Sequence, residues 1–304
     1  HPLTSRVVVN RFWAQLFGTG LVKTLEDFGS QSEWPSHPEL LDWLAREFVD
    51  GGWNVKALFR TLVLSSTYRQ SSAASPALLA RDPENRLLAR GPRVRLPAEL
   101  IRDQALAASG LLAARVGGPS VYPYQPEKLY EGIVVGAAYP GTTWPKASGE
   151  DLYRRSLYTF WKRTVPHPAM IAFDSPDREF CTVRRSRTNT PLQALVLWNE
   201  PGYVEAARRL ATRMIREGGA EDAARIAVAF QSATGRKPKP EEIRVLANAW
   251  TKLRTDFAAH GEDAVALLKT GASSVDGMIP PAELAAATGV ASMILNLDET
   301  ITKN

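Results

Sequence analysis

The chain has 304 residues, of which 44% are hydrophobic and 23% are charged. These fractions are typical of globular proteins and exclude a wholly disordered chain. No apolar run reaches the roughly 20 residues of a membrane-spanning helix, and we expect no membrane span. The net charge of +5 is modest beside that of dedicated nucleic-acid-binding proteins, so we expect no nucleic-acid partner. A single cysteine excludes an internal disulfide and a CxxCH haem-attachment motif in this chain.

The first helix signals form a pair between residues 36 and 62. Ser36-His37-Pro38-Glu39 has the pattern of a capping box and predicts a helix that ends at Gly51-Gly52. Asn54 predicts the cap of a second helix, whose apolar residues share one face. Because only a short glycine turn separates the two helices, we predict a helical hairpin.

The middle of the chain is less regular. Pro97 predicts the start of a helix that ends at Gly110, because proline is tolerated in the first turn and glycine ends helices. From Gly117 to Gly149 the chain is rich in glycine, proline and aromatic residues, which predicts a long irregular region of the kind that often carries function. The stretch 153–163 alternates enough for a strand and is short enough for a helix, and both alternatives stay open.

Helix signals return in the C-terminal part of the chain. Four helices are predicted, each with proline in its first turn, over about 191–198, 201–216, 240–260 and 281–295. The first of them follows Thr190-Pro191-Leu192-Gln193, a second capping-box pattern. The predicted fold class is therefore all-α or mostly α, with at most a few short strands. We expect one domain over 1–304, with the irregular segment 117–190 packed on it.

Six phrases of the sequence are long and unusual in composition: 6–13 (RVVVNRFW), 36–44 (SHPELLDWL), 82–88 (DPENRLL), 153–163 (YRRSLYTFWKR), 181–195 (CTVRRSRTNTPLQAL) and 295–300 (LNLDET). In this order they resemble the planctomycete-enriched domain of unknown function 1553. The resemblance covers essentially the whole chain.

The resemblance implies a bacterial protein that is exported to the periplasm or secreted. It also implies a C-terminal domain of a longer protein, whose upstream domains often include a c-type cytochrome-like module. A start at His1, without methionine, agrees with that expectation. We therefore expect the upstream domains as partners, haem only in those domains, and no cofactor in this fragment. Because the family has no established activity, no catalytic residues are carried over.

The main candidate for ligand binding is an arginine-rich segment directly before the helix expected at residue 191. Arg184, Arg185 and Arg187 stand there with Asn189 and Thr190. A helix N-terminus favours an anion through its unpaired amides and partial positive charge, and arginine adds bidentate hydrogen bonds to sulfate, phosphate or carboxylate. The alternative is that the arginines pair with acidic residues just upstream and only fix the loop.

Those acidic residues form a second candidate group together with a histidine. His167, Asp174, Asp177 and Glu179 could act as acid and base in catalysis, or the carboxylates could hold a cation. Their spacing fits no metal-site template, so we predict no metal site, and the Asp-Ser-Pro-Asp stretch is also a common turn or helix cap. Cys181 has apolar neighbours, which predicts a buried, unreactive thiol.

Aromatic residues are the third feature of the irregular region. They either stack on sugar rings or pack beneath the loops, and the residues concerned are Tyr122, Tyr124, Tyr139, Trp144, Tyr158 and Trp161. Tryptophans on the expected helix faces are predicted to be core residues: Trp13, Trp43, Trp53 and Trp198.

Three functions stay open. The first is an accessory domain of an exported multidomain protein that binds an anion, with a polyanionic glycan as the ligand and polysaccharide utilisation as the setting. The second is part of a hydrolytic or redox enzyme whose site is completed by the upstream domains. The third is a structural docking domain for the upstream region.

Overall fold

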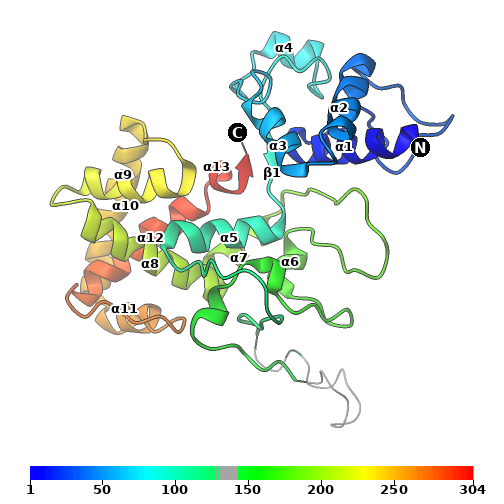
Figure 1. Ribbon diagram of the computed structural model, residues 1–304. Coiled ribbons are helices and arrows are strands. Elements are labelled where there is room, and N and C mark those ends of the chain that lie inside the picture. Colours follow the sequence, from blue (N-terminus) through cyan, green and yellow to red (C-terminus); the bar gives the residue numbers. More distant parts are fainter. Residues whose placement is uncertain (127–128, 130–142, 304) are drawn as a thin grey trace. The chain divides into compact units, whose positions relative to one another are not determined.

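The computed structural model describes residues 1–126, 129 and 143–303 (Figure 1). These residues form a mostly helical fold with one two-stranded sheet, which confirms the predicted fold class. The chain divides into two compact units. Unit 1 contains His1–Arg95, Cys181–Arg184 and the residues from Thr302 onward, and unit 2 contains Leu96–Phe180 and Arg185–Ile301. Within the described ranges, every helix is too short or too polar to cross a membrane.

Unit 1 is built from four helices: α1 (Pro2–Phe17), α2 (Pro38–Asp50), α3 (Val55–Leu64) and α4 (Pro76–Arg81). α1 contacts α2 and α3, and their apolar faces form a core in which the rings of Trp13 and Phe17 stack at 3.9 Å. The end of the chain returns to this unit, because β2 (Thr302–Lys303) pairs antiparallel with β1 (Val94–Arg95). The Lys303 ammonium lies 3.5 Å from the centroid of the Tyr68 ring, a cation–π contact that adds to the closure.

The predicted helical hairpin is present as α2 and α3. The stop at Gly51 and the cap at Asn54 are confirmed, since Asn54 Oδ1 accepts a hydrogen bond from the Ala57 amide at 3.0 Å. The predicted capping box at Ser36 is wrong. His37 is the residue before the helix, no side chain caps it, and the Ser36 hydroxyl lies 3.0 Å from His37 Nδ1 instead.

Three of the four tryptophans predicted to be core residues are exposed. Trp13 is 4% exposed, but Trp43 is 51%, Trp53 is 46% and Trp198 is 40% exposed. On α2 the core-facing side is occupied by smaller apolar residues, namely Leu41, Leu44, Ala45 and Phe48. Trp43 lies two positions after Leu41, about half a turn around the helix, and therefore points away from this apolar side.

Unit 2 contains nine helices and two short 3-10 turns within the described residues: α5 (Ala98–Ser109), η1 (Gly149–Tyr153), η2 (Ser156–Tyr158), α6 (Pro168–Ala172), α7 (Pro191–Asn199), α8 (Pro201–Glu217), α9 (Asp222–Thr234), α10 (Pro240–Ala259), α11 (Gly261–Leu268), α12 (Pro281–Leu295) and α13 (Asp298–Ile301). The proline starts predicted for α7, α8, α10 and α12 are all confirmed. α12 contacts α8, α10 and α11 and is buried on every side, as expected of a helix with an apolar surface all round (Figure 1).

The described part of the irregular segment is held by single bridges rather than by a sheet. Val121 bridges Thr159, and Ala113 bridges Arg154. The stretch 153–163 forms neither the strand nor the helix that its sequence allowed. It contains the end of η1 and all of η2, and the rest of it has no regular structure.

Arginine side chains stabilise these loops by donating hydrogen bonds to the backbone carbonyl groups of the loops. Arg154 is fully buried, donates to the carbonyl oxygens of Gly117 and Pro119, and places its guanidinium 3.8 Å from the centroid of the Tyr158 ring. Buried carbonyl groups need donors, and loops make few backbone hydrogen bonds of their own. Arginine, with five N–H groups, therefore replaces the missing hydrogen-bond ladder.

Two further arginines use the same device. Arg102 donates to the Leu152 and Arg154 carbonyls at 2.6 and 2.9 Å, and Arg208 donates to the Ser273 and Ser274 carbonyls at 2.8 and 3.1 Å. The first contact ties α5 to the loop at 152–156, and the second ties α8 to the loop before α12. Many arginines of this chain are thus structural, and a ligand-binding arginine has to differ from them in its contacts.

Candidate functional site

The predicted ligand segment, residues 184–190, is exposed along its whole length. Arg184 belongs to unit 1 and makes no hydrogen bond or ion pair with any residue that the structure describes. Residues 185–190 belong to unit 2 and lead into α7. Thr190 is the residue before that helix, but its side chain makes no capping hydrogen bond, so the capping box predicted here is wrong.

Arg185 has one polar partner among the described residues. Its Nη1 donates to Glu99 Oε2, in the first turn of α5, at 2.7 Å, and the two side chains are 40% and 20% exposed. The expected alternative placed its partners among the acidic residues at 174–179. The observed partner lies 86 residues away in sequence, in α5. A single contact of this kind leaves most of the guanidinium N–H groups directed elsewhere.

Thr188 helps to fix the segment in place. The Thr188 amide donates to Asp174 Oδ2 at 2.7 Å, and its hydroxyl lies 3.0 and 2.9 Å from the two Asp174 oxygens. Gln193, in the first turn of α7, donates to the same hydroxyl at 3.1 Å. Asp174 adopts a φ of 59°, a left-handed conformation that aspartate tolerates better than most residues. The segment before α7 is therefore exposed but anchored.

The structure does not bring the four catalytic candidates together. Asp174 binds Thr188, whereas the Asp177 side chain accepts from the Glu179 amide at 2.9 Å, which is a turn of the kind that the sequence also allowed. His167 is 5% exposed, and its Nε2 donates to the Tyr124 carbonyl at 2.8 Å. Among the described residues no group of three His, Cys, Asp or Glu side chains could hold a metal ion.

The environments of Cys181 and of the aromatic residues in the loops can be compared with the predictions. Cys181 is exposed, so the predicted buried thiol is wrong. Tyr122 stacks on Phe160 at 4.9 Å between ring centroids and meets Trp144 edge-on at 5.0 Å. These contacts support the alternative of packing beneath loops over that of a sugar platform. Tyr139 lies outside the described residues.

Sequence reasoning missed a fully buried carboxylate on α8. Glu205 accepts hydrogen bonds from the Tyr124 and Tyr153 hydroxyls, at 2.8 and 2.9 Å, and from the Ser273 amide at 2.5 Å. Arg208 lies 3.7 Å away as its counter-ion. Burial and the neighbouring carboxylate raise the pKa of Tyr153 to about 12. No short sequence motif identifies this cluster, because its members come from four separate parts of unit 2.

A second polar group, at the N-terminus of α8, surrounds Arg102. Glu200 caps α8 by accepting from the Tyr203 amide at 3.1 Å. Asp103 Oδ1 accepts from the Ser156 amide at 2.7 Å and lies 3.9 Å from Arg102. Burial raises the pKa of Glu200 to about 7 and lowers that of His167 to about 4, although Arg102 and two backbone amides favour the ionised form of Glu200.

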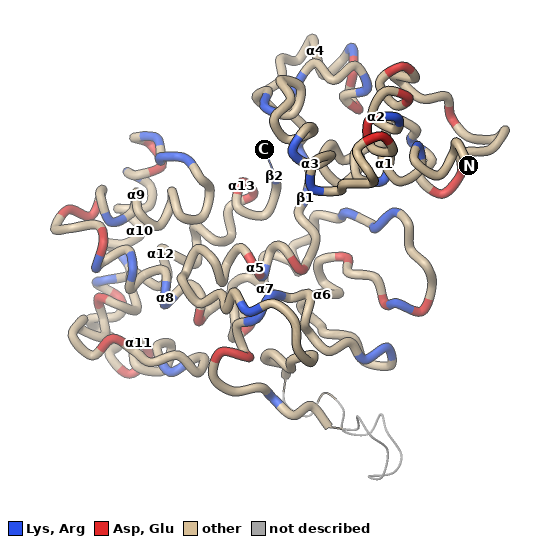
Figure 2. The backbone as a smooth tube through the Cα atoms, viewed as in Figure 1, with Lys and Arg blue, Asp and Glu red and all other residues tan. Residues whose placement is uncertain are grey.

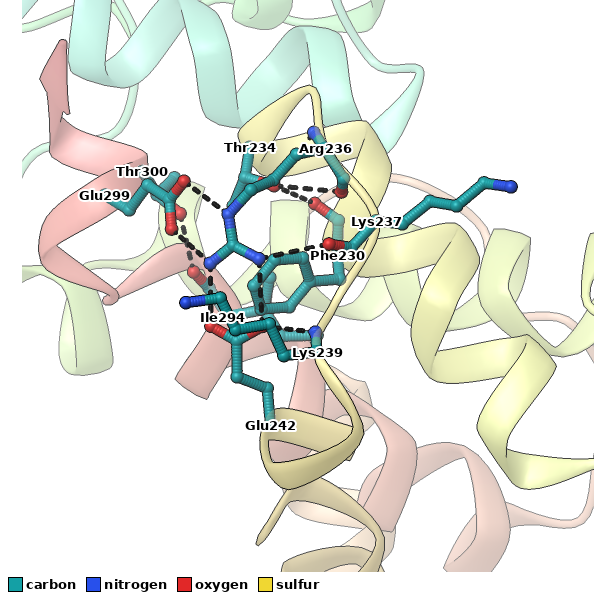
Figure 3. Close-up of polar contacts among 9 residues, drawn as sticks. All are labelled: Phe230, Thr234, Arg236, Lys237, Lys239, Glu242, Ile294, Glu299 and Thr300. Atoms are coloured by element: carbon teal, nitrogen blue, oxygen red, sulfur yellow. Dashed lines mark hydrogen bonds and ion pairs between the residues drawn. The ribbon is translucent and has the colours of Figure 1, made fainter. Parts of the chain in front are cut away.

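Two other arginines of this chain, Arg236 and Arg254, each form hydrogen bonds to two carboxylates. Arg236 binds Glu242 and Glu299 on its two edges, with four hydrogen bonds of 2.6–2.9 Å, and its guanidinium lies 4.8 Å from the Phe230 ring centroid (Figure 3). Figure 3 shows the two carboxylates approaching from separate helices, α10 and α13. This contact joins the loop between α9 and α10 to both α10 and α13.

Arg254 repeats the arrangement on the neighbouring helices. It binds Asp222 and Glu283 through four hydrogen bonds of 2.5–2.8 Å, and its guanidinium lies 4.3 Å from the Trp250 ring centroid. Elsewhere along the chain, basic and acidic residues are intermixed and do not separate by sign (Figure 2). Arg185, with a single contact and greater exposure, differs from both clamped arginines.

Comparison with known proteins agrees with the resemblance read from the sequence. The profile of the family described as "Protein of unknown function (DUF1553)" matches residues 1–250, a range that contains Arg185, Thr188, Glu200 and Glu205. Neither a curated protein nor a solved structure matches the chain. Because the match covers most of its length, the chain belongs to the DUF1553 family of proteins of unknown function.

Proposed function

We propose that this chain is an accessory binding domain that recognises an anionic ligand through residues 185–190, with Arg185 as the principal contact. The observation that carries the proposal is the difference between Arg185 and the structural arginines. Arg236 and Arg254 each have two carboxylates on their guanidinium edges, whereas Arg185 makes one end-on hydrogen bond and is 40% exposed. A ligand oxyanion would complete the hydrogen bonding of Arg185 without breaking any other contact.

The anchoring of the segment supports the same proposal. Thr188 is held by Asp174 and Gln193, so the backbone on both sides of it is already ordered before a ligand arrives. An ordered site loses less conformational entropy on binding, which raises its affinity for a given set of contacts. Arg187, Asn189 and Thr190 follow Arg185 along this segment and are exposed, and we include them in the proposed site.

For the ligand we propose an anionic glycan carrying sulfate or carboxylate groups. Exposed guanidinium groups suit such oxyanions. The setting that would supply a glycan is the exported, multidomain protein that the family resemblance implies, with any haem in its upstream domains. We hold the export, the polysaccharide setting and the haem as parts of this proposal.

The test is a thermal-shift titration with sulfate, phosphate and a sulfated oligosaccharide. Saturation at about 100 times the Kd should stabilise the protein by about 2.7 kcal/mol. We expect this shift in the unmodified protein and its loss in Arg185→Ala. The matched control is Arg216→Ala, which also removes an exposed arginine, 54% exposed and paired with the less exposed carboxylate of Asp276. Equal shifts in both variants, or no shift with any of the three anions, would retire the proposal.

A docking role is the second candidate, and one observation favours it. The side of α7 opposite its buried residues carries Leu192, Leu195 and Trp198, which are 57%, 56% and 40% exposed. Tryptophan is enriched at the centre of protein interfaces, and neighbouring exposed apolar side chains are typical of interaction surfaces. We propose the upstream region of the longer chain as the occupant in this case.

Sedimentation of this chain mixed with the separately produced upstream region tests the docking role. Leu195→Arg should weaken that complex, because it places a charge in the apolar face. The control is Leu64→Arg, at the end of α3, where the leucine is 60% exposed. Association that is absent, or equally affected by both substitutions, would exclude this candidate.

A further inference from the structure

The outer face of α3, in unit 1, carries two cations that the helix itself does not favour. Lys56 and Arg60 stand four residues apart, so they project from the same side of the helix, and both are exposed. Like charges at this spacing repel each other, and Lys56 also lies in the first turn, where the helix dipole disfavours a cation. α3 contains no acidic residue, and neither cation has a polar partner among the described residues.

The two cations belong to the unit that holds the net charge of the chain. Unit 1 contains 14 basic and 9 acidic residues, so its net charge is +5, which equals that of the whole chain. Unit 2 contains the remaining 23 basic and 23 acidic residues and is neutral. A negatively charged surface is therefore attracted to unit 1 as a whole, beyond the attraction of Lys56 and Arg60 alone.

Trp53 stands just before the cap of α3, in a backbone conformation that is rare for a bulky residue. Its φ is 58°, and it is the one aromatic residue with a left-handed φ among those that the structure describes. The turn needs this conformation, because the Trp53 amide donates to the Phe48 carbonyl at 2.8 Å, at the end of α2. Glycine or asparagine would adopt it at a lower conformational cost. Strained residues of this kind cluster at ligand sites.

Exposed apolar side chains lie at both ends of this face. Trp53 is 46% exposed, and Leu64, the last residue of α3, is 60% exposed. Lys56, Arg60 and Leu64 follow one another at intervals of four residues and form a row along the helix. Phe48 meets the Trp53 ring edge-on, with 5.2 Å between the ring centroids, which fixes the ring without covering it. Tryptophan and leucine together with lysine and arginine are typical of surfaces that enter the headgroup region of a bilayer.

We propose that the outer face of α3, together with Trp53, attaches unit 1 reversibly to an anionic phospholipid bilayer. Lys56 and Arg60 bind the phosphate groups of the lipids, and Trp53 and Leu64 enter the headgroup region at the two ends of the face. Lipid phosphates between the two cations remove their repulsion, and the dipole of α3 favours an anion at its first turn.

A bilayer suits this face better than a soluble anion does. A soluble anion would bind the two cations but leave Trp53 and Leu64 in water, whereas a bilayer contacts all four side chains. The proposal does not rest on the anion site at 185–190 or on the docking role of α7, because both of those lie in unit 2.

Co-sedimentation of the intact protein with lipid vesicles tests the surface. Vesicles of equal parts phosphatidylcholine and phosphatidylglycerol should bind the protein, less so as salt is added, and vesicles of phosphatidylcholine alone should bind far less of it. The double variant Lys56→Gln, Arg60→Gln should weaken binding to the mixed vesicles by roughly tenfold or more. Its Tm should equal or exceed that of the parent, because the substitutions remove a like-charge pair and glutamine suits a helix. Trp53→Asn, which tolerates the left-handed backbone, should also weaken binding.

The matched control is Arg244→Gln with Lys252→Gln, which removes two exposed cations from α10 and gives the same net charge. This control and Arg185→Ala should bind the mixed vesicles as the parent does, so that failure of this surface and failure of the site at 185–190 are distinguished. Equal binding by the two double variants, or equal binding to both kinds of vesicle, would overturn the proposal. So would release of the protein by free glycerol phosphate at the same total phosphate concentration. If Trp53→Asn does not fold, the two double variants still decide.

Discussion

At the scale of single residues, two arginines of unit 2, Arg236 and Arg254, are each held between two carboxylates beside an aromatic ring. Arg236 joins the start of α10 to α13 in this way (Figure 3). Isolated surface ion pairs contribute little to stability, but a bidentate network with partly buried members contributes more. The geometry needs a planar fork, which lysine lacks.

Replacing Arg236 by lysine should therefore lower the free energy of unfolding by about 1–2 kcal/mol near neutral pH. Arg236 holds the pKa of Glu242 at about 2, below its ordinary 4.5. A carboxylate with a lowered pKa contributes stability above about pH 4.5 and loses it as the pH falls towards 2. Urea unfolding should show a large difference between variant and parent near pH 7 and a small one near pH 2.

Arg46→Lys supplies the comparison for this measurement. Arg46 pairs with Asp50, and the two side chains are 78% and 55% exposed, so the substitution should leave the stability almost unchanged. An Arg236→Lys variant that loses nothing near neutral pH, or loses equally at both pH values, would show that the clamp does not stabilise the fold.

The partners of these residues explain why the sequence identifies arginines but not their roles. Arg185 was predicted as a candidate from its place before a helix, and the structure shows that it is exposed. Its contact with Glu99 spans 86 residues, and that of Arg236 with Glu299 spans 63. No feature of the neighbouring sequence distinguishes Arg185 from Arg236. The polar group around Glu200 was missed for the same reason, because its members Arg102 and Asp103 lie about 100 residues earlier in the sequence.

At the scale of elements, local signals placed helices well where proline or glycine marks an end. The starts of α8 and α12 and the end of α5 agree with prediction, since these residues act through their own backbone. Side-chain caps were predicted less well. Ser36 and Thr190 matched the capping pattern, but their hydroxyls do not cap, because the choice of partner depends on where the preceding loop runs. The stretch 153–163 was undecidable for a similar reason, because distant residues such as Arg102 and Val121 hold its backbone.

The loop between α11 and α12 offers a prediction at this scale. Gly271 has a φ of 90°, and a Cβ built there would lie 2.7 Å from the Cβ of Glu205. Gly271→Ala should therefore cost more than the left-handed backbone strain alone, by about 1–3 kcal/mol, because it displaces the carboxylate that binds Tyr124 and Tyr153. Urea unfolding of the variant measures the loss.

Gly219→Ala separates the two contributions. Gly219 has a φ of 74°, but a Cβ built there meets nothing within 4 Å. Its substitution carries only the conformational cost of roughly 1 kcal/mol. Equal losses in the two variants would mean that the Glu205 network yields without cost.

At the scale of the whole molecule, each of the two units is built from separate stretches of the chain. The boundaries fall at residues 95–96, 180–181, 184–185 and 301–302. Unit 1 is thus completed by the last residues of the sequence, where Lys303 pairs with Val94. Because neither unit is one uninterrupted stretch of sequence, the single domain predicted for 1–304 stays our prediction.

We therefore predict that the full chain unfolds in one cooperative transition, with equal calorimetric and van't Hoff enthalpies. Removing residues 302–304 deletes β2 and the Lys303 contact with the Tyr68 ring, so the transition should move to lower temperature. Under the single-domain prediction it moves as a whole. The control is Lys303→Met, which loses the cation–π contact but keeps the β1–β2 pairing, and its transition should fall between the other two. A calorimetric trace that separates into two transitions, in the full chain or in the shortened one, would show that the two units are independent domains.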